Sequence, residues 1–190
     1  APSYRADFGH SGHYSHGLGK QSSDSKYKSI IYILSKDKDN RKAFNYADYS
    51  EVIYAFNADD GEKLWETKLP QRAYSAPAIT EGILYAGTAD GELIALNAVT
   101  GEKVWSAKTK GQMTHTPVVL NGFVYVSSLI SPDGKKRENF APDKGTGFVS
   151  AFDIKKKSLA WKMEISQSPL SCPTAVGQTV VVGSLDKTLY

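Results

Sequence analysis

The chain has 190 residues, of which 41% are hydrophobic and 11% aromatic, and its formal net charge is +3. That length suits one domain, and the composition is that of an ordinary globular protein. The charge is too small to favour nucleic acid as a partner, and no apolar stretch is long enough to span a membrane. A single cysteine allows no internal disulfide, so cysteine usage does not identify the compartment.

Residues 1–29 are rich in Gly, Ser and His and show no alternation typical of strands. We expect an irregular lead-in here, running across the face or edge of the domain that follows. His10, His13 and His16 are the metal-site candidates of this segment, because imidazoles are common ligands of zinc and copper. Only Asp7 lies near enough in sequence to complete a site, so the alternative is that these histidines are hydrogen-bonded surface residues.

One pattern recurs three times in the remaining chain: Ala, then Asn or Asp two residues later, then Trp eight residues after that. The copies cover residues 55–65, 95–105 and 151–161. Each indicates a strand, a tight turn closed by the Asn or Asp side chain, and a second strand. The turn ends at Gly61 and Gly101, which allow a positive φ, but at Lys157 in the third copy, where a strained or different turn is expected.

Each unit also contains a proline twelve residues after its tryptophan, and then another strand-like run. Glu81-Gly82 and Asn121-Gly122 precede two of these runs, and Asn-Gly is a strong hairpin signal. Residues 30–34 align with 83–87 as the second strand of a first unit, so its first strand is expected near residues 20–28. A unit is therefore four short strands, and a period of about 40–45 residues predicts propeller blades.

These patterns predict an all-β fold, a β-propeller of four-stranded antiparallel blades over residues 30–190. Trp65, Trp105 and Trp161 occupy one repeat position and are predicted to be structural wedges that dock neighbouring blades. The fourth unit stops at Leu189-Tyr190, in the middle of its third strand, which predicts open sheet edges. We expect the chain to belong to a ring of about seven or eight blades, or to one that another chain completes; a four-blade ring is the alternative.

The Ala-x-Asp/Asn-x-x-Thr-Gly-x-x-x-Trp run resembles the tryptophan-docking motif of the pyrroloquinoline-quinone (PQQ)-type repeat. The copy at 95–105 matches every fixed position, the copy at 55–65 has Asp60 in place of Thr, and the third departs at Lys156 and Lys157. The resemblance implies a propeller like those of quinoprotein dehydrogenases and of BamB-type outer-membrane assembly factors. It also implies a periplasmic or otherwise extracytoplasmic location in the cell envelope.

Two insertions, at residues 36–50 and 131–146, join the second and third strands of the first and third units. Equivalent loops emerge on one face of a propeller, often the binding face. The sharper interpretation is a rim that binds a protein partner, and the alternative is a pair of solvated connections. The partner-binding candidates are the basic and aromatic residues Arg41, Phe44, Tyr46, Tyr49, Arg137 and Phe140.

The sequence shows no catalytic constellation, and no cofactor is expected. Cys172 is predicted to lie in the core, and His115 near the inner end of a blade, hydrogen-bonded. Tyr32, Tyr85 and Tyr125 are predicted to pack within and between blades. A quinoprotein dehydrogenase would, by the resemblance, need PQQ with calcium, an Asp base and, in many members, adjacent cysteines, which this sequence lacks.

The leading hypothesis is a non-catalytic propeller that acts as a scaffold or protein-binding subunit of a cell-envelope assembly. The first alternative is a fragment of a PQQ-dependent quinoprotein dehydrogenase or a related redox subunit. The second is an ectodomain that senses a polysaccharide or another ligand through Phe44, Tyr46 or Phe140.

Overall fold

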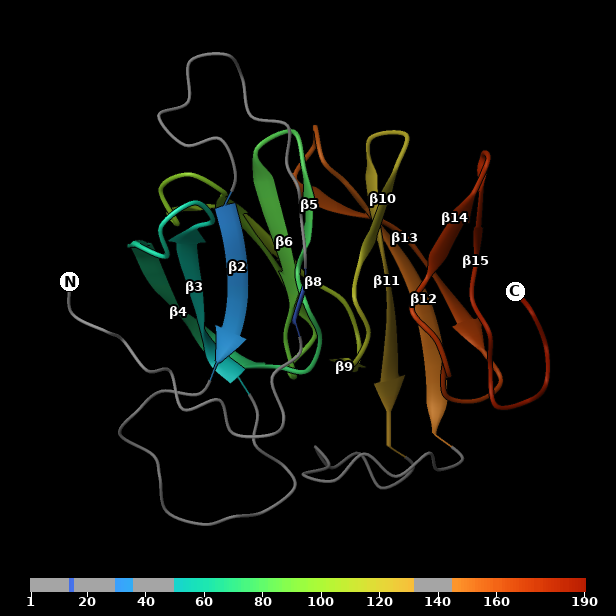
Figure 1. Ribbon diagram of the computed structural model, residues 1–190. Coiled ribbons are helices and arrows are strands. Elements are labelled where there is room, and N and C mark those ends of the chain that lie inside the picture. Colours follow the sequence, from blue (N-terminus) through green and yellow to red (C-terminus); the bar gives the residue numbers. More distant parts are fainter. Residues whose placement is uncertain (1–13, 16–29, 36–49, 132–144) are drawn as a thin grey trace, which may run out of the picture.

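The structure is a computed structural model that describes residues 14–15, 30–35, 50–131 and 145–190. These residues form strands and no helix, arranged as antiparallel sheets that stand side by side (Figure 1). The sheets are successive blades of a β-propeller, as the repeat predicts. None of the described segments is a helix suited to crossing a membrane.

The blades follow one another along the chain. Blade 1 has the strands β1 (Tyr14–Ser15), β2 (Ile30–Ser35), β3 (Ser50–Asn57) and β4 (Lys63–Ala73). Blade 2 has β5 (Ala78–Thr80), β6 (Ile83–Gly87), β7 (Glu92–Asn97) and β8 (Lys103–Lys108). Blade 3 has β9 (Gln112–Met113), β10 (Val118–Leu120), β11 (Phe123–Ile130), β12 (Thr146–Asp153) and β13 (Ser158–Ile165). The fourth sheet has β14 (Thr174–Val176) and β15 (Thr179–Val181).

The first strand of blade 1 differs from the expectation. Tyr14 pairs with Ile33 and Ser15 with Tyr32, so β1 comes earlier in the chain than the predicted residues 20–28, which lie outside the described residues. A pairing partner for β2 is therefore supplied from within the expected lead-in.

The inner hairpins of blades 2 and 3 turn through two residues of positive φ. These are Glu81 (φ 47°) with Gly82 (φ 72°), and Asn121 (φ 51°) with Gly122 (φ 78°). Positive φ at both central residues defines the type I′ turn, whose twist matches that of the flanking strands. The hairpins predicted from these dipeptides are confirmed.

The outer hairpins of the three blades share one register. The alanine of the repeat lies opposite its tryptophan each time, and a bulge follows at once: Ala55↔Trp65, Ala95↔Trp105 and Ala151↔Trp161. The turns are closed as predicted, because the Asn97 side chain accepts a bond from the Val99 amide at 2.8 Å. Lys157 keeps the left-handed conformation at φ 56°, so the third turn is the strained version of the same turn.

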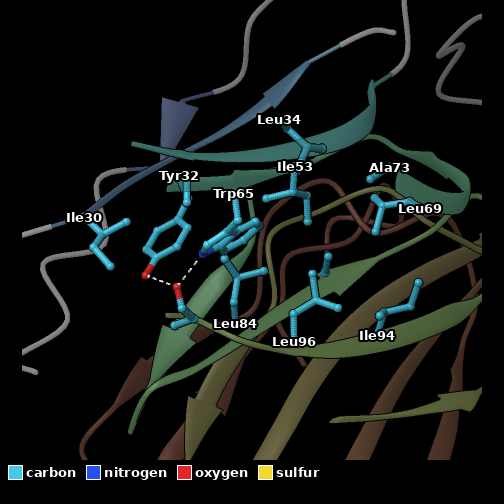
Figure 2. Packing of buried hydrophobic residues seen from close by; sticks show 13 residues of the cluster. Ile30, Tyr32, Leu34, Ile53, Trp65, Leu69, Ala73, Leu84, Ile94 and Leu96 are labelled. Atoms are coloured by element: carbon cyan, nitrogen blue, oxygen red, sulfur yellow. Dashed lines mark hydrogen bonds between the residues drawn. The ribbon is translucent and has the colours of Figure 1, made fainter. Parts of the chain in front are cut away.

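The apolar core lies between neighbouring blades. One cluster joins blades 1 and 2 and includes Tyr32, Ile53 and Leu84 (Figure 2). A second joins blades 2 and 3 around Met113 and Phe152. The third, beside the fourth sheet, has only Val149, Ile165 and Val182 as buried members. Each blade thus depends on the next one to bury its apolar face.

Candidate functional site

Two donors and one acceptor form a polar contact between blades 1 and 2. The Tyr32 hydroxyl and the Trp65 indole Nε1 both donate to the Ala98 carbonyl, at 2.9 and 3.1 Å (Figure 2). The two rings lie 5.8 Å apart between centroids. Tyr32 belongs to β2 and Trp65 to β4, whereas Ala98 follows β7, so the contact links two strands of blade 1 to the turn after β7 in blade 2.

Gly101 is a second residue of blade 2 that lies against Trp65. A Cβ at Gly101 would lie 2.6 Å from Trp65 Cε3, and the residue has φ +74°. The Thr67 hydroxyl adds a bond of 2.7 Å to the Gly101 carbonyl. A glycine is therefore required here both by the backbone and by the indole above it. Thr67 was missed by the sequence reasoning because no repeated residue marks its position.

Blades 2 and 3 repeat the apolar part of this contact. The Tyr85 and Trp105 rings lie 6.0 Å apart, and Trp105 is 8% exposed. They share a cluster with Phe152 of β12, against which Ile154 packs. Burial, together with the nearby Glu81 carboxylate, raises the pKa of Tyr85 to about 12. The predicted packing of Tyr32 and Tyr85 between blades is confirmed.

Blade 3 carries the same aromatic pair on an open face. The Tyr125 and Trp161 rings lie 5.9 Å apart, edge to face, and Trp161 is 45% exposed. In blade 2, the turn after β7 covers Trp65 of blade 1. The described part of the fourth sheet has no corresponding turn to cover Trp161. The role of the three tryptophans as docking residues stays a prediction, which the variants in the Discussion test.

The strands that flank both predicted insertions end on one side of the array. β2 and β11 run in the same direction and finish at the lower side of Figure 1. The stems are paired up to their last described residues, with Ser35 opposite Val52 and Ile130 opposite Thr146. We call this side the loop face. The candidates Arg41, Phe44, Tyr46, Tyr49, Arg137 and Phe140 lie outside the described residues.

Blade 2 has a tight turn on the loop face. The Asp90 carboxylate accepts bonds from the Thr88 hydroxyl at 2.7 Å and from Lys108 Nζ at 3.0 Å. Burial alone would raise the pKa of Asp90, but these bonds and the lysine charge outweigh it and hold the pKa below its usual value. Sequence reasoning missed this turn, although the recurrence of Gly-Thr/Ser-x-Asp at 87–90 and 183–186 marks it.

The fourth sheet repeats that turn. Asp186 accepts hydrogen bonds from the Ser166 hydroxyl, from the Tyr190 hydroxyl at 2.6 Å and from the Thr188 amide at 2.9 Å. The Ser166 bond, followed by the Tyr190 bond, lowers the pKa of Asp186 far below its usual range. These contacts hold the last described residues of the chain against β13.

His115 lies at the inner end of blade 3, and the predicted hydrogen bonding is confirmed. Its Nδ1 is 3.0 Å from the Thr114 hydroxyl and 3.3 Å from the Ser127 hydroxyl. Burial lowers the pKa of the imidazole below 6.5, so the neutral ring is favoured.

Within the described ranges, the buried Ser75 Oγ and Gln112 Nε2 have no hydrogen-bond partner.

Cys172 is exposed, so its predicted place in the core is wrong. It lies two residues before β14, a strand whose three residues are all exposed. The residues 14–15, 30–35, 50–131 and 145–190 bring together no three His, Cys, Asp or Glu side chains that suit a metal ion. His10, His13 and His16 lie outside these ranges.

A family model described as outer membrane protein assembly factor BamB matches residues 48–186, which is more than half of the chain. The chain belongs to this family. Its PQQ-type repeats are thereby established, in agreement with the resemblance seen in the sequence. No curated protein matches this chain.

Solved propellers resemble this BamB-family chain in fold. BamB from Moraxella catarrhalis is 18% identical with a TM-score of 0.56, over 85% of this chain and 42% of that one. The quinohemoprotein alcohol dehydrogenase ADHIIG from Pseudomonas putida HK5 is 25% identical with a TM-score of 0.52, over 71% of this chain and 19% of that one. The computationally designed Ika4 protein is 14% identical with a TM-score of 0.62, over 93% and 96%. The chain thus spans less than half the length of that BamB.

Proposed function

We propose that the chain is a non-catalytic propeller that presents its loop face to a protein partner within a cell-envelope assembly, in an extracytoplasmic compartment. The observation that carries the proposal is the alternation of connections on the loop face. Blades 1 and 3 have the insertions there, whereas blade 2 and the fourth sheet have the tight turns at Asp90 and Asp186. The membership of the BamB family supports an assembly role.

The stems support the proposal because they are closely packed. Leu34 and Val52, at the stem of the first insertion, are buried. In the second stem, a Cβ at Gly145 would clash with the Ile130 carbonyl, so the two strands approach as closely as a glycine allows. A loop held on such a stem loses less conformational entropy when it binds than a loop on a frayed one.

Site-specific photo-crosslinking tests the proposal. A photoreactive residue is placed at Phe44, Tyr46 or Phe140, and the control is Glu102, which is exposed in the turn at the opposite end of blade 2. In the envelope fraction of the source cells, the loop positions should crosslink to one common protein and Glu102 should not. Crosslinks to that protein from Glu102 alone, or from none of the positions, contradict the loop face as the binding face.

A second candidate is a redox subunit, favoured by the likeness to the quinohemoprotein dehydrogenase. The described residues do not fit a calcium-supported quinone, because they gather no set of metal ligands, and no reaction step is derived from them. Titration with PQQ and Ca²⁺ separates the two functions: the scaffold predicts an unchanged quinone absorption spectrum, and a saturable spectral shift would favour the redox subunit.

A further inference from the structure

The turn between β10 and β11 contains an asparagine followed by a glycine, Asn121-Gly122, and the sequence has this dipeptide once. Both residues are exposed and have positive φ, so they form the tip of a type I′ hairpin. The tip lies at the upper side of Figure 1, opposite the loop face. A glycine in this place leaves its backbone nitrogen open to the preceding side chain, because it has no Cβ.

The Gly122 amide nitrogen is available as an attacking group. Among the described residues it has no hydrogen-bond acceptor, whereas the Gly122 carbonyl accepts a bond from the Ile154 amide at 3.0 Å. A Cβ at Gly122 would meet nothing within 4 Å, so the space around this residue is open. The turn is therefore tied down at its carbonyl, and its amide faces no competing partner.

Asn97 shows the opposite arrangement. Its side-chain oxygen accepts a hydrogen bond from the Val99 amide at 2.8 Å. The backbone amide that follows it, of Ala98, donates to the Gly82 carbonyl at 2.9 Å, so this nitrogen is engaged. Asn97 is therefore an internal control for any reaction between the Asn121 side chain and the next amide.

A side chain of the fourth sheet holds the Asn121 amide group. Asn121 Nδ2 donates to Gln178 Oε1, and Gln178 lies in the turn that joins β14 to β15. Asn121 Nδ2 is the atom that would leave as ammonia if the side chain were attacked. A hydrogen bond that fixes this nitrogen opposes the rotation that brings the side-chain carbonyl carbon to the Gly122 nitrogen.

We propose that Asn121 is a site of spontaneous deamidation and that Gln178 slows the reaction. The Gly122 nitrogen loses its proton and forms a bond to the side-chain carbonyl carbon of Asn121, the bond from that carbon to Nδ2 breaks, and ammonia leaves with the proton. Water then opens the cyclic imide at either carbonyl and gives aspartate or isoaspartate. The net reaction takes up water and releases ammonia, and it needs no other reactant. It does not depend on the proposed function, because the turn lies opposite the loop face.

The isoaspartate product changes the inner hairpin of blade 3. Its backbone is longer by a methylene group, whereas the pairing of Leu120 with Phe123 leaves room for two residues in the turn. The bond from the Ile154 amide fixes the Gly122 carbonyl at the tip, so the longer turn cannot simply bulge outward. The modified chain should therefore lose pairing of β10 and unfold at a lower temperature than the parent.

Peptide mapping of the full chain tests the inference. The folded chain is incubated at mildly alkaline pH in heavy-oxygen water, digested and analysed by mass spectrometry. The peptide with Asn121 should yield aspartate and isoaspartate forms that carry heavy oxygen, while the peptide with Asn97 stays unmodified. Gly122→Ala should suppress the reaction at Asn121, because the new Cβ hinders the attacking nitrogen.

Gln178→Ala tests the role of the contact. The variant should deamidate about threefold faster or more in the folded chain, as expected for the loss of a hydrogen bond. The matched control is Gln71→Ala, an exposed glutamine of β4 in blade 1 whose removal should leave the rate unchanged. In urea that unfolds both chains, the parent and Gln178→Ala should react at the same rate, because the contact is absent there. Thermal unfolding of the variant is measured in parallel, so that acceleration through a loss of fold is recognised.

Two results overturn the site. They are an Asn121 peptide that stays unmodified in the folded chain while the unfolded chain is fully converted, and conversion without uptake of heavy oxygen. The role of Gln178 is overturned if the folded parent and Gln178→Ala react equally fast, or if the acceleration persists in urea.

Discussion

Blades 1 and 3 carry the same tyrosine–tryptophan pair in different surroundings. In both, the rings lie about 6 Å apart and the tryptophan stands opposite the alanine of the repeat. Yet Trp65 is 9% exposed and Trp161 is 45% exposed. The pair is therefore built by the hairpins of its own blade, whereas its burial is decided by the turn of the next blade.

The difference in exposure between Trp65 and Trp161 indicates that each tryptophan stabilises the fold mainly through its contact with the next blade. In repeat proteins the stability is roughly a sum of unit and nearest-neighbour terms. The covered contact combines apolar burial with two bonds to one carbonyl, and the open one has only the contact within its blade. Substitutions at equivalent positions of blades 1 and 3 should therefore differ in size, although the residues are the same.

The largest difference is expected between Trp65→Ala and Trp161→Ala. Removal of Trp65 opens a cavity between blades and should lower the free energy of unfolding by about 3–5 kcal/mol, as should Trp105→Ala. Trp161 is only partly buried, so its removal should cost about 1 kcal/mol. Urea denaturation monitored by circular dichroism measures both. Equal losses would show that the indole stabilises its own blade and not the interface.

The next comparison is Gly101→Ala against Gly61→Ala. Both residues have positive φ, so each alanine should cost about 1 kcal/mol from the backbone alone. At Gly101 the new Cβ would also meet Trp65, whereas nothing lies within 4 Å of it at Gly61. The Gly101 variant should lose about 1–3 kcal/mol more.

Thermal unfolding of the parent chain, Gly61→Ala and Gly101→Ala measures the additional loss of stability expected for Gly101→Ala. The double variant Gly101→Ala with Trp65→Ala is the control, because the excess should vanish once the indole is absent. If the excess persisted in that background, the tryptophan contact would not be its cause.

A smaller effect is expected where the third copy departs from the repeat. Lys157 has φ 56°, so Lys157→Gly relieves backbone strain but adds flexibility to the unfolded chain. The net effect should be a gain of about 0.5 kcal/mol. Lys156→Gly, at a position without positive φ, should instead destabilise by about 0.5–1 kcal/mol. Chemical denaturation distinguishes the two signs, and a loss for both would mean that the strain is already compensated.

The smallest effect concerns pH. His115 is half-buried, and its pKa is lower in the folded state than the ordinary value of 6.5 because of desolvation. Between the folded and unfolded pKa values the unfolded chain binds more protons, so His115 makes stability fall as the pH decreases below about 6.5. His115→Gln should flatten the difference in unfolding free energy between pH 7 and pH 5. An unchanged slope would show that the imidazole is accessible to protons in the folded chain.

Much of the fold was predictable because the repeat is local. The turn dipeptides at 81–82 and 121–122, the Asn97 turn and the alignment of tryptophans depend on residues close in sequence. The first strand of blade 1 was misplaced because Tyr14 and Ser15 pair with β2 across a long connection. Pairing at such a distance leaves no periodic signal in a strand of two residues.

The sites were predictable to a lesser extent. Cys172 shares a repeat position with residues that are partly buried, but burial there depends on a neighbouring sheet and not on the residue itself. The polar parts of the blade contact, such as the Thr67 hydroxyl, need three-dimensional proximity that no spacing reveals. The partner-binding candidates of the loop face remain predictions.

Hydrogen exchange of the three indole Nε1–H groups tests the central claim most directly. In the ¹⁵N-tryptophan-labelled chain, assigned with single Trp→Phe variants, Trp65 and Trp105 should exchange slowly because neighbouring blades cover them, and Trp161 should exchange much faster. If Trp161 were protected as strongly as Trp65 in a chain shown to be monomeric, the next blade would not be what buries the tryptophans, and the account would be contradicted.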